Sequence, residues 1–410
     1  MTHNQPRWVS GMPNQITPIP AIVVGGGENC GGLGVVRSLS RDKISIWIVD
    51  RDASAPGLHS RYATKLISSE MTGLSLVKDL LLLRARLHDR PVLFLTSDEA
   101  VLTVSEYRKE LKDNFRFRLP SHQRLCALMH KIEFQQLAEL HGFPVPRSIR
   151  VRSKNDLSRL SDLGFPCVVK PAIKTAKYRA SGLRPAYKVF TTAEAEAVCG
   201  QLLPILPDLV VQEWIEGPDD ELYFCLTYHT SEGPLCSFTG RKLSIWPPNV
   251  GPTASCTVAP DAHATLAPVT TAFFQAVSFE GLGSIEFKRD TRTGQFLMIE
   301  PTVGRVDWQE EVATLHGINI PLSVYRYEAE GQVPCASQVS RPIIWRDFAR
   351  HRNATHRARG HQSIKTGAKI YDAYWRLNDP LPALFYVSRL FMRILHNVLR
   401  SAISRRAASK

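Results

Sequence analysis

Apolar runs alternate with helical patterns over the first hundred residues. Residues 21–27 (AIVVGGG) predict a strand that runs into glycines, residues 28–39 predict a loop and a helix, and residues 44–50 (ISIWIVD) predict a second strand. A leucine-rich helix and a further strand follow at 75–98. Strands that alternate with helices in this way are typical of βαβ units on a parallel sheet. We therefore expect a Rossmann-like domain over residues 20–118.

The pattern changes after Pro120. A helical pattern covers residues 122–142 and ends at Gly142, a common residue just after the C-terminus of a helix. Short β-prone runs and helical stretches then follow one another without a fixed alternation. They predict strands at 165–171, 187–190, 209–217 and 219–229 and from 233, and helices near 155–163, from 191 and over 267–282. The second part of the chain is therefore predicted to be α+β.

One predicted hairpin carries two acids. Residues 283–301 hold two apolar, β-prone runs on either side of a polar turn that ends in Gly294. A turn centred near Thr293 places Glu286 and Glu300 opposite each other, with Cβ atoms roughly 5 Å apart. Facing carboxylates are costly unless a cation lies between them, and Mg²⁺ commonly takes one or two carboxylates together with substrate phosphates. The alternative is that both acids point to solvent on an exposed face.

Basic residues are concentrated at the C-terminal end of the chain. The net charge is +13, and residues 331–410 hold 15 Lys and Arg against 3 Asp, whereas the residues before them are nearly neutral. Residues 379–406 predict a cationic amphipathic helix. Such a helix can lie on an anionic membrane surface, dock on a protein partner or pack on the body of the protein. The nearly neutral body argues against nucleic-acid binding.

The length of the chain and its cysteines indicate how many domains it forms and in which compartment it folds. A chain of 410 residues with 44% apolar residues is expected to form two or three domains with ordinary cores. The eight cysteines are scattered without CxxC pairs, and no secretory signal precedes them, which favours a reducing cytoplasm. No uninterrupted apolar run reaches the length of a transmembrane helix.

The glycines of residues 25–34 suggest two interpretations. Their spacing (GGGENCGGLG) departs from GxGxxG, but Asp50 ends the next strand, where a dinucleotide-binding fold places its ribose-binding acid. The first interpretation is therefore nicotinamide or flavin binding. The second is that the glycine loop packs a turn or binds the end of a small substrate.

The order of five features along the chain resembles a known family. Lys131 opens an amphipathic helix before GFPVPRS, Lys170 ends the strand FPCVVKP, and VVQEWIEG (210–217) is a strand that enters a turn. Glu286 and Glu300 then lie on successive strands. This order resembles the ATP-grasp superfamily. More narrowly, it resembles the carboxylate–amine ligases, in the group of D-aspartate ligase and the carbamoyl-phosphate-synthase-like proteins.

The resemblance implies an α/β fold, α+β in part, with a Rossmann-like pre-ATP-grasp domain before the ATP-grasp domain. The expected boundaries are a flexible leader at 1–19, the pre-ATP-grasp domain at 20–118, the ATP-grasp domain at 119–330, with a lid-bearing subdomain at about 119–208 and a catalytic subdomain at about 209–330, and a basic C-terminal extension at 331–410.

The resemblance also implies residues that bind ATP. Lys131 and Lys170 would contact the phosphates, because polyphosphate needs fixed cations. Asp219 or Glu221 would hold the ribose hydroxyls, although members of this acidic cluster also fit a solvated turn. The adenine ring would be bound by the segment Gln212, Glu213, Trp214 and Ile215.

Glu286 and Glu300 would hold Mg²⁺ or Mn²⁺ by the same resemblance. Arg241, Lys242 and Arg305 would meet the transferred phosphoryl group or a substrate carboxylate, where a guanidinium can grip two oxygens at once. A surface position is the alternative for each arginine. No triad of serine, histidine and aspartate is required by this chemistry.

Two departures from the family pattern are visible. The lid is usually glycine-rich, but residues 172–188 contain Gly182 alone among five basic residues, namely Lys174, Lys177, Arg179, Arg184 and Lys188. The second metal-binding strand often carries Glu-x-Asn, and here Thr302 stands in the place of the asparagine. Either two carboxylates and waters suffice for the metal, or Asp307 or Asn319 helps.

The implied activity is an ATP-dependent carboxylate–amine ligase that joins a small-molecule acid and an amine through an acyl phosphate. A different class remains open, a non-catalytic ATP-binding module tethered by the basic tail to a membrane or protein partner. A third interpretation is another ATP-grasp enzyme, such as a carboxylase. The expected location is cytoplasmic, with peripheral membrane attachment as the variant that the tail suggests.

Overall fold

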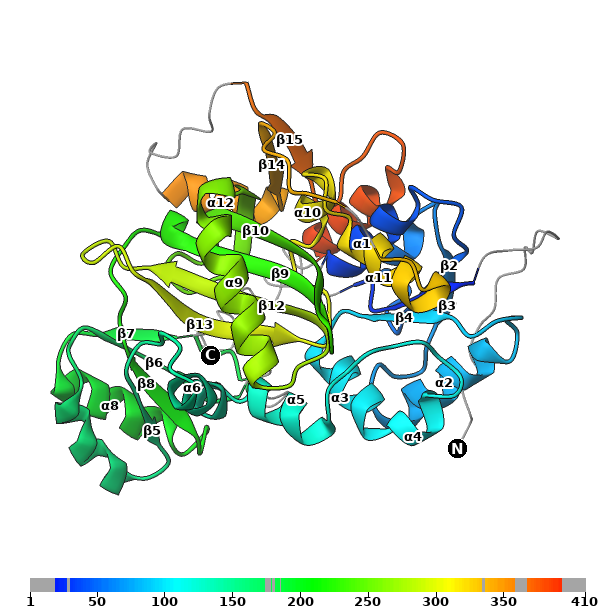
Figure 1. The fold of residues 1–410 in the computed structure, drawn as a ribbon. Coiled ribbons are helices and arrows are strands. Elements are labelled where there is room, and N and C mark those ends of the chain that lie inside the picture. The colour runs from blue at the N-terminus through cyan, green and yellow to red at the C-terminus, as the bar shows by residue number, and fades with distance from the viewer. Residues whose placement is uncertain are drawn as a thin grey trace, which may run out of the picture. The chain divides into compact units, whose positions relative to one another are not determined.

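The computed structural model describes residues 19–27, 30–173, 178, 181–184, 186–333, 336–357 and 367–392. The chain forms two compact units (Figure 1). One unit contains the residues up to Phe117 together with Tyr325–Gln332 and the segment from Tyr371 onward. The other contains Arg118–Val324 and Val333–Ile370. Within the described residues, no helix is both long and apolar enough to cross a membrane.

The first unit is built on a parallel sheet of four strands in the order β3-β2-β1-β4. This confirms the predicted βαβ pattern, and β1 is buried at every position because helices and loops cover it. The elements are β1 (Ala21–Val24), α1 (Gly31–Leu39), β2 (Ile46–Asp50), η1 (Pro56–His59), β3 (Thr64–Ile67), α2 (Gly73–Arg84), β4 (Val92–Leu95), α3 (Asp98–Glu106) and α4 (Arg108–Leu111).

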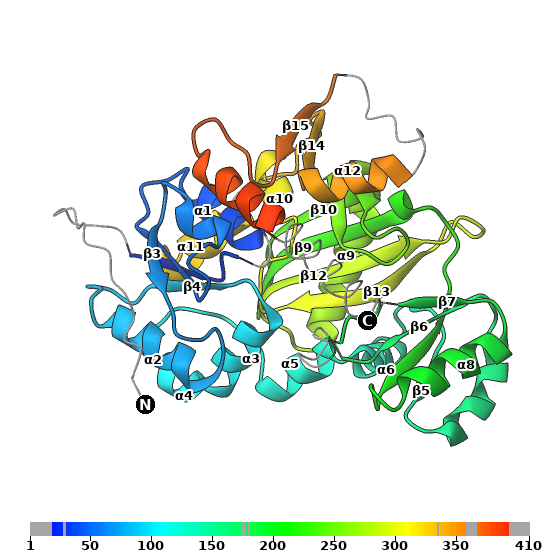
Figure 2. The same cartoon turned by 180° about the vertical axis from the view of Figure 1, so that it is seen from behind.

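The second unit contains a small antiparallel sheet in the order β5-β8-β6-β7. Its strands are β5 (Ser148–Val151), β6 (Cys167–Pro171), β7 (Tyr187–Val189) and β8 (Leu209–Glu213). The helix α8 (Thr192–Leu202) covers one face and buries Ala195, Cys199 and Leu202 against it (Figure 2). The predicted helix near 155–163 is a 3-10 helix, η2 (Lys154–Asp162), which begins with a capping box between Ser153 and Asp156.

The prediction of one continuous helix over 122–142 is wrong. The structure has two helices, α5 (His122–Met129) and α6 (Lys131–Leu140), separated by His130 in an extended conformation. The His130 ring caps α6 by accepting from the Glu133 N–H, and it also contacts Asp208 at 3.1 Å. A helical pattern in sequence does not reveal this break, because the partner that holds His130 lies 78 residues away.

The second unit also contains a larger sheet of seven strands, in the order β13-β12-β9-β10-β11-β14-β15. The strands are β9 (Leu222–Thr230), β10 (Gly233–Ile245), β11 (Thr253–Val258), β12 (Gly281–Arg289), β13 (Phe296–Val303), β14 (Ile343–Arg346) and β15 (Lys369–Asp372). The helices α9 (Pro260–Ala276), α10 (Glu311–Leu315) and α12 (Phe348–Arg357) belong to this unit, whereas α11 (Ile320–Glu330) continues into the segment Tyr325–Gln332 of the first unit.

The helix predicted over 267–282 is displaced in the structure. α9 begins at Pro260, in the first turn where a missing N–H is harmless, and ends at Ala276. Pro268, close to the predicted start at residue 267, lies inside it. The helix packs on β9 and β10 and lies across one face of the sheet (Figure 1). Its apolar face includes Phe273 and Phe274, both fully buried.

The C-terminal tail is helical over residues 381–392, and the rest of the predicted amphipathic helix lies outside the described residues. The described part packs within the first unit. Arg389 forms an ion pair with Asp52 at 2.9 Å, and the Phe385 ring stacks on His59. Of the three alternatives for this helix, its described part therefore follows one: it packs on the body of the protein.

Candidate active site

The two acids of the hairpin face each other as predicted. Glu286 of β12 is the register partner of Glu300 of β13, next to a local irregularity of the ladder. Each carboxylate is paired with a lysine from another element. The Lys131 Nζ lies 2.5 Å from Glu300 Oε2, and the Lys242 ammonium donates to Glu286 Oε2. The like charges of the pair are thus offset by two cations.

Lys242 is the electrostatic centre of this group. Its side chain is only 5% exposed. Burial lowers the pKa of an ammonium, but Glu286 at hydrogen-bond distance, followed by Asp307 and Glu300, more than offsets this, so the pKa of Lys242 is raised. Three carboxylates therefore act on one buried positive charge.

The metal that the hairpin suggested has a limited set of protein ligands. Among the described residues, no group of three or more His, Cys, Asp or Glu side chains lies together as a metal site. Thr302 pairs in register with Ser284, whose hydroxyl donates to Asp307 at 2.9 Å. Two carboxylates suit Mg²⁺ when substrate phosphates complete its shell. Glu286 and Glu300 fit that arrangement, and their role as metal ligands stays a prediction.

The two further ligands considered from the sequence differ in position. Asp307 acts on Lys242 and so lies near the acidic pair. Asn319 lies before α11, where its side-chain oxygen accepts from the Leu322 N–H at 3.1 Å. The asparagine is therefore used as a helix cap, and Asp307 is the better placed of the two.

Lys170 belongs to a second polar cluster, on the small sheet. Its Nζ donates to Gln212 Oε1 at 2.7 Å, and the Gln212 amide donates in turn to Gln135 of α6 at 3.3 Å. The Lys131 N–H donates to the Ala172 carbonyl, two residues beyond Lys170. The elements that carry the two predicted phosphate-binding lysines are thus joined, and Gln212 orients one of them.

Some backbone groups of the predicted adenine-binding segment, residues 212–215, already form hydrogen bonds within the protein. The backbone N–H groups of Glu213 and Trp214 donate to the carbonyls of Arg147 and Pro166. The Lys188 ammonium lies 4.1 Å from the centre of the Trp214 ring. Ile215 is buried. Adenine recognition at this segment would therefore fall to Ile215 and to the carbonyl groups.

The acidic cluster after this segment is not a freely solvated turn. Arg241 of β10 contacts both Asp220 and Glu221 at 3.2 Å. Asp219 accepts from the Asn249 N–H at 3.1 Å, and burial raises the pKa of its carboxyl. The structure therefore brings Arg241 to the predicted ribose-binding acids, whereas its neighbour Lys242 donates to Glu286 of the facing acidic pair.

Arg305 and the lid complete the predicted residues. The Arg305 guanidinium donates to the carbonyl of its neighbour Val306 at 3.1 Å. Of the five basic lid residues, Arg184 and Lys188 are described, whereas Lys174, Lys177 and Arg179 lie outside the described residues. Sequence reasoning missed Gln135 of the lysine cluster, and it missed the structural role of Lys288, which donates to the carbonyls of Gly217 and Pro218. Neither has a signal in sequence, because both act through distant elements.

The glycine loop of the first unit is explained by packing. A Cβ at Gly32 would lie 2.0 Å from the Gly25 carbonyl oxygen, so glycine is needed for α1 to approach the loop. The Asp50 carboxylate accepts from the N–H groups of Gly26 and Asp52 at 2.7 and 2.9 Å. Of the two interpretations, the structure supports a packed turn, because the acid suggested for ribose holds the loop itself.

Comparison with curated proteins finds ligases. The chain is 21% identical over 239 residues to a D-aspartate ligase of Enterococcus faecium, a match that covers 53% of each chain. It is 34% identical over 98 residues to a D-alanine–D-alanine ligase of Pseudomonas fluorescens, covering 22% of this chain and 26% of that protein. The chain thus spans about half the length of the first relative and a quarter of the second. No protein-family model matches.

Solved structures share the fold over most of the chain. N5-carboxyaminoimidazole synthetase from Staphylococcus aureus, complexed with ADP, matches with a TM-score of 0.61 at 14% identity and covers 80% of this chain and 82% of that one. The biotin carboxylase domain of a 2-oxoglutarate carboxylase from Hydrogenobacter thermophilus, in complex with MgADP, matches with a TM-score of 0.59 at 13% identity, covering 79% and 72%. The chain therefore has the ATP-grasp fold that the order of its motifs predicts, and in sequence it is similar to D-aspartate and D-alanine–D-alanine ligases.

Proposed function

We propose that the protein is an ATP-dependent carboxylate–amine ligase that forms an amide bond between two small molecules and releases ADP and phosphate. The observation that carries this proposal is the facing pair Glu286 and Glu300, each held by a lysine, in a fold shared with nucleotide-bound structures. The D-aspartate and D-alanine–D-alanine ligases among the relatives support an amino acid as one of the substrates.

The chemistry follows from charge. Glu286 and Glu300 would hold Mg²⁺, which would supply positive charge to offset the phosphate charge during transfer. A substrate carboxylate attacks the γ-phosphorus and ADP leaves; an amine then displaces phosphate from the acyl phosphate and an amide forms. Lys131 and Lys242, which pair with the acids, would also contact the phosphate oxygens of ATP. The protein thus supplies position and fixed charge.

The test is ADP release from Mg-ATP on addition of an amino-acid mixture, followed by mass spectrometry of the products. Glu300→Gln keeps the shape of the side chain and removes its charge, so we expect ADP release to fall by about 100-fold or more. Glu232→Gln, on an exposed loop of the same unit, is the matched control and should keep full activity. Turnover that survives Glu300→Gln would show that the metal assignment is wrong.

A non-catalytic ATP-binding module is the second candidate, favoured by Thr302 in the place of the expected asparagine. It predicts that ATP binds with Mg²⁺ but that no acid or amine stimulates ADP release. Addition of bicarbonate separates a third case: ADP release with bicarbonate in place of an amino acid would indicate a carboxylase. Binding by equilibrium dialysis and ADP release measured on the same preparation distinguish the three.

A further inference from the structure

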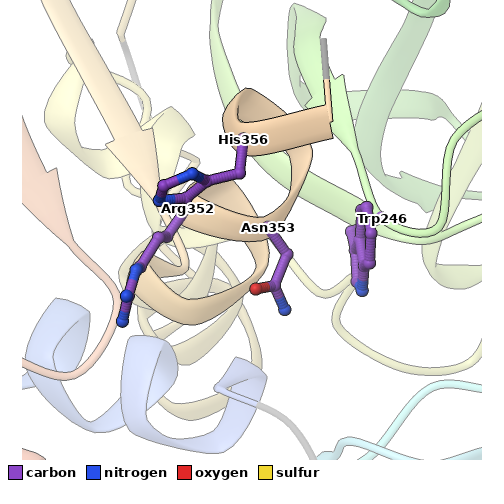
Figure 3. Close-up of a pocket in the computed structure, with 4 residues that line it drawn as sticks. All are labelled: Trp246, Arg352, Asn353 and His356. Carbon is purple, nitrogen blue, oxygen red and sulfur yellow. The ribbon is translucent and has the colours of Figure 1, made fainter. Parts of the chain in front are cut away.

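An open cavity of about 560 Å³ lies in the second unit, away from the acidic pair. It is lined by Trp246, directly after β10, and by Arg352, Asn353 and His356 of α12 (Figure 3). Figure 3 shows Arg352 and His356 side by side, with Asn353 between them and the indole of Trp246. Its volume is in the range of small-molecule sites.

The helix α12 is anchored by its other residues, and this leaves the lining residues available. His351 is buried, and its Nδ1 lies 3.3 Å from the hydroxyl of Ser244 on β10. Arg350 pairs with Asp347 at 3.3 Å and lies over the Trp308 ring. These contacts have structural roles, whereas Arg352, Asn353 and His356 are exposed. The face toward the cavity is therefore not required to hold the helix in place.

The side of α12 that lines the cavity carries positive charge at Arg352, which favours an anionic ligand. Arg352 and His356 are four residues apart on one side of α12, so their side chains are neighbours on the helix surface and both face the cavity. The helix contains no acid, and among the described residues no carboxylate pairs with Arg352. A bound carboxylate or phosphate would accept charge-assisted hydrogen bonds from the Arg352 guanidinium. The indole opposite offers a face on which a flat group can pack.

Distance along β10 relates the cavity to the proposed reaction. Lys242 of β10 precedes Trp246 by four residues, which corresponds to at most roughly 13 Å of chain because the ladder is irregular between Lys242 and Ile245. On the basis of the proposed function, we infer that this cavity binds the flat, anionic far end of an elongated substrate whose reacting end lies at Glu286 and Glu300. The anion is a carboxylate or a phosphate, and Arg352 and Trp246 determine which substrates are accepted.

The experiment measures binding of benzoate, phenyl phosphate and uncharged benzamide to the full chain by titration calorimetry, without ATP. We expect one of the two anions to bind and benzamide to bind at least tenfold more weakly. Arg352→Gln should weaken the anion at least tenfold, and Trp246→Leu should weaken all aromatic probes. Arg159→Gln, an exposed arginine on η2, is the control and should change nothing. The tighter of the two anions identifies carboxylate or phosphate.

Equal anion affinity in wild type, Arg352→Gln and Arg159→Gln, or no binding of either anion to the wild type, would overturn the inference. Because these titrations need no turnover, they are independent of whether ADP is released. If the ligase activity is present, Arg352→Gln should raise the KM of the elongated substrate at least tenfold while kcat and the KM of ATP stay within twofold. An equal loss of kcat for all substrates would contradict a binding role.

Discussion

At the scale of single residues, the site is organised by burial of charge. Lys242 remains cationic inside the second unit because carboxylates surround it, and its neighbour Arg241 on β10 serves a different pair of acids. Adjacent residues of a strand point to opposite faces, so two neighbouring cations reach two different places. One is the ribose-binding region that the family resemblance implies, and the other is the acidic hairpin.

Replacing Lys242 separates its charge from its volume. Lys242→Met removes the cation that faces Glu286, so we expect ADP release to fall by about 100-fold while ATP affinity changes by less than tenfold. Lys288→Met is the matched control, because Lys288 is also a buried lysine but donates to backbone carbonyls. It should cost stability and leave kcat near normal in the folded fraction. Similar kcat losses in both variants would contradict a specific role for Lys242.

Glu310 gives a pH dependence of stability. Its side chain is fully buried, and burial, assisted by Asp307, raises the pKa of its carboxyl to about 8. The folded state therefore keeps a proton that the unfolded chain has lost, so the free energy of unfolding falls as pH rises from about 4.5 to about 8.

Glu310→Gln removes this titration. The variant should be more stable than the wild type at pH 8.5, by on the order of 2–4 kcal/mol, and about equally stable at pH 5. Urea unfolding at both pH values measures the difference, with Glu232→Gln as the control. Parallel pH profiles for Glu310→Gln and wild type would show that Glu310 ionises normally in the folded protein.

At the scale of elements, the break between α5 and α6 places the first lysine of the site. His130 ends one helix and caps the next. The Asp208 carboxylate contacts the His130 ring and also accepts from Arg150, whose Nη2 lies 2.6 Å from it. Lys131 follows directly and reaches Glu300. The position of Lys131 therefore depends on an acid at the beginning of β8.

Asp208→Ala tests this connection. Loss of the carboxylate removes charge-assisted bonds to Arg150 and His130, so we expect the free energy of unfolding to fall by about 1–3 kcal/mol. ATP affinity should also fall, because Lys131 is no longer fixed. Asp162→Ala, an exposed acid on η2, serves as the comparison in urea unfolding and equilibrium dialysis. A loss of stability with unchanged ATP affinity would mean that Lys131 is held by other contacts.

At the scale of the whole molecule, the C-terminal segment returns to the first unit. Asp379 is almost completely buried, and it accepts from Arg37 Nε at 3.1 Å, from the Ser60 hydroxyl at 3.0 Å and from the Arg61 N–H at 3.0 Å. Arg37 also donates to the carbonyls of Ala373 and Tyr374. A buried arginine of α1 thus depends on residues more than 300 positions later.

Asp379→Ala leaves the Arg37 charge buried without its carboxylate, so we expect a loss of about 3–5 kcal/mol from the first unit. Hydrogen exchange of peptides from residues 21–50 should show it, with peptides from the second unit unchanged. Deletion of residues 393–410 keeps Asp379 and should leave this exchange as in wild type. If that deletion also keeps pelleting with anionic liposomes unchanged, the tail is not a membrane anchor.

Local patterns foretold the parts of the fold that depend on neighbours in sequence. The parallel βαβ start and the hairpin with Glu286 opposite Glu300 were both predicted, because strand pairing across a short turn is set by the turn itself. The limits of α9 and the break at His130 were not. The helix α9 begins seven residues before the predicted start and includes Pro268, and His130 is held by a residue outside its own helix.

The sequence by itself determined the order of the elements, the facing acids and the family resemblance, since each rests on local periodicity or on the succession of motifs along the chain. Only the tertiary structure decided which cations meet those acids. Lys131 and Glu300 are 169 residues apart, and α12 brings Arg352 to the cavity that Trp246 also lines, from a segment that sequence analysis identified only as basic. Which charges pair and how deeply they are buried depend on contacts between segments that are distant in sequence, and these contacts form only when the chain folds.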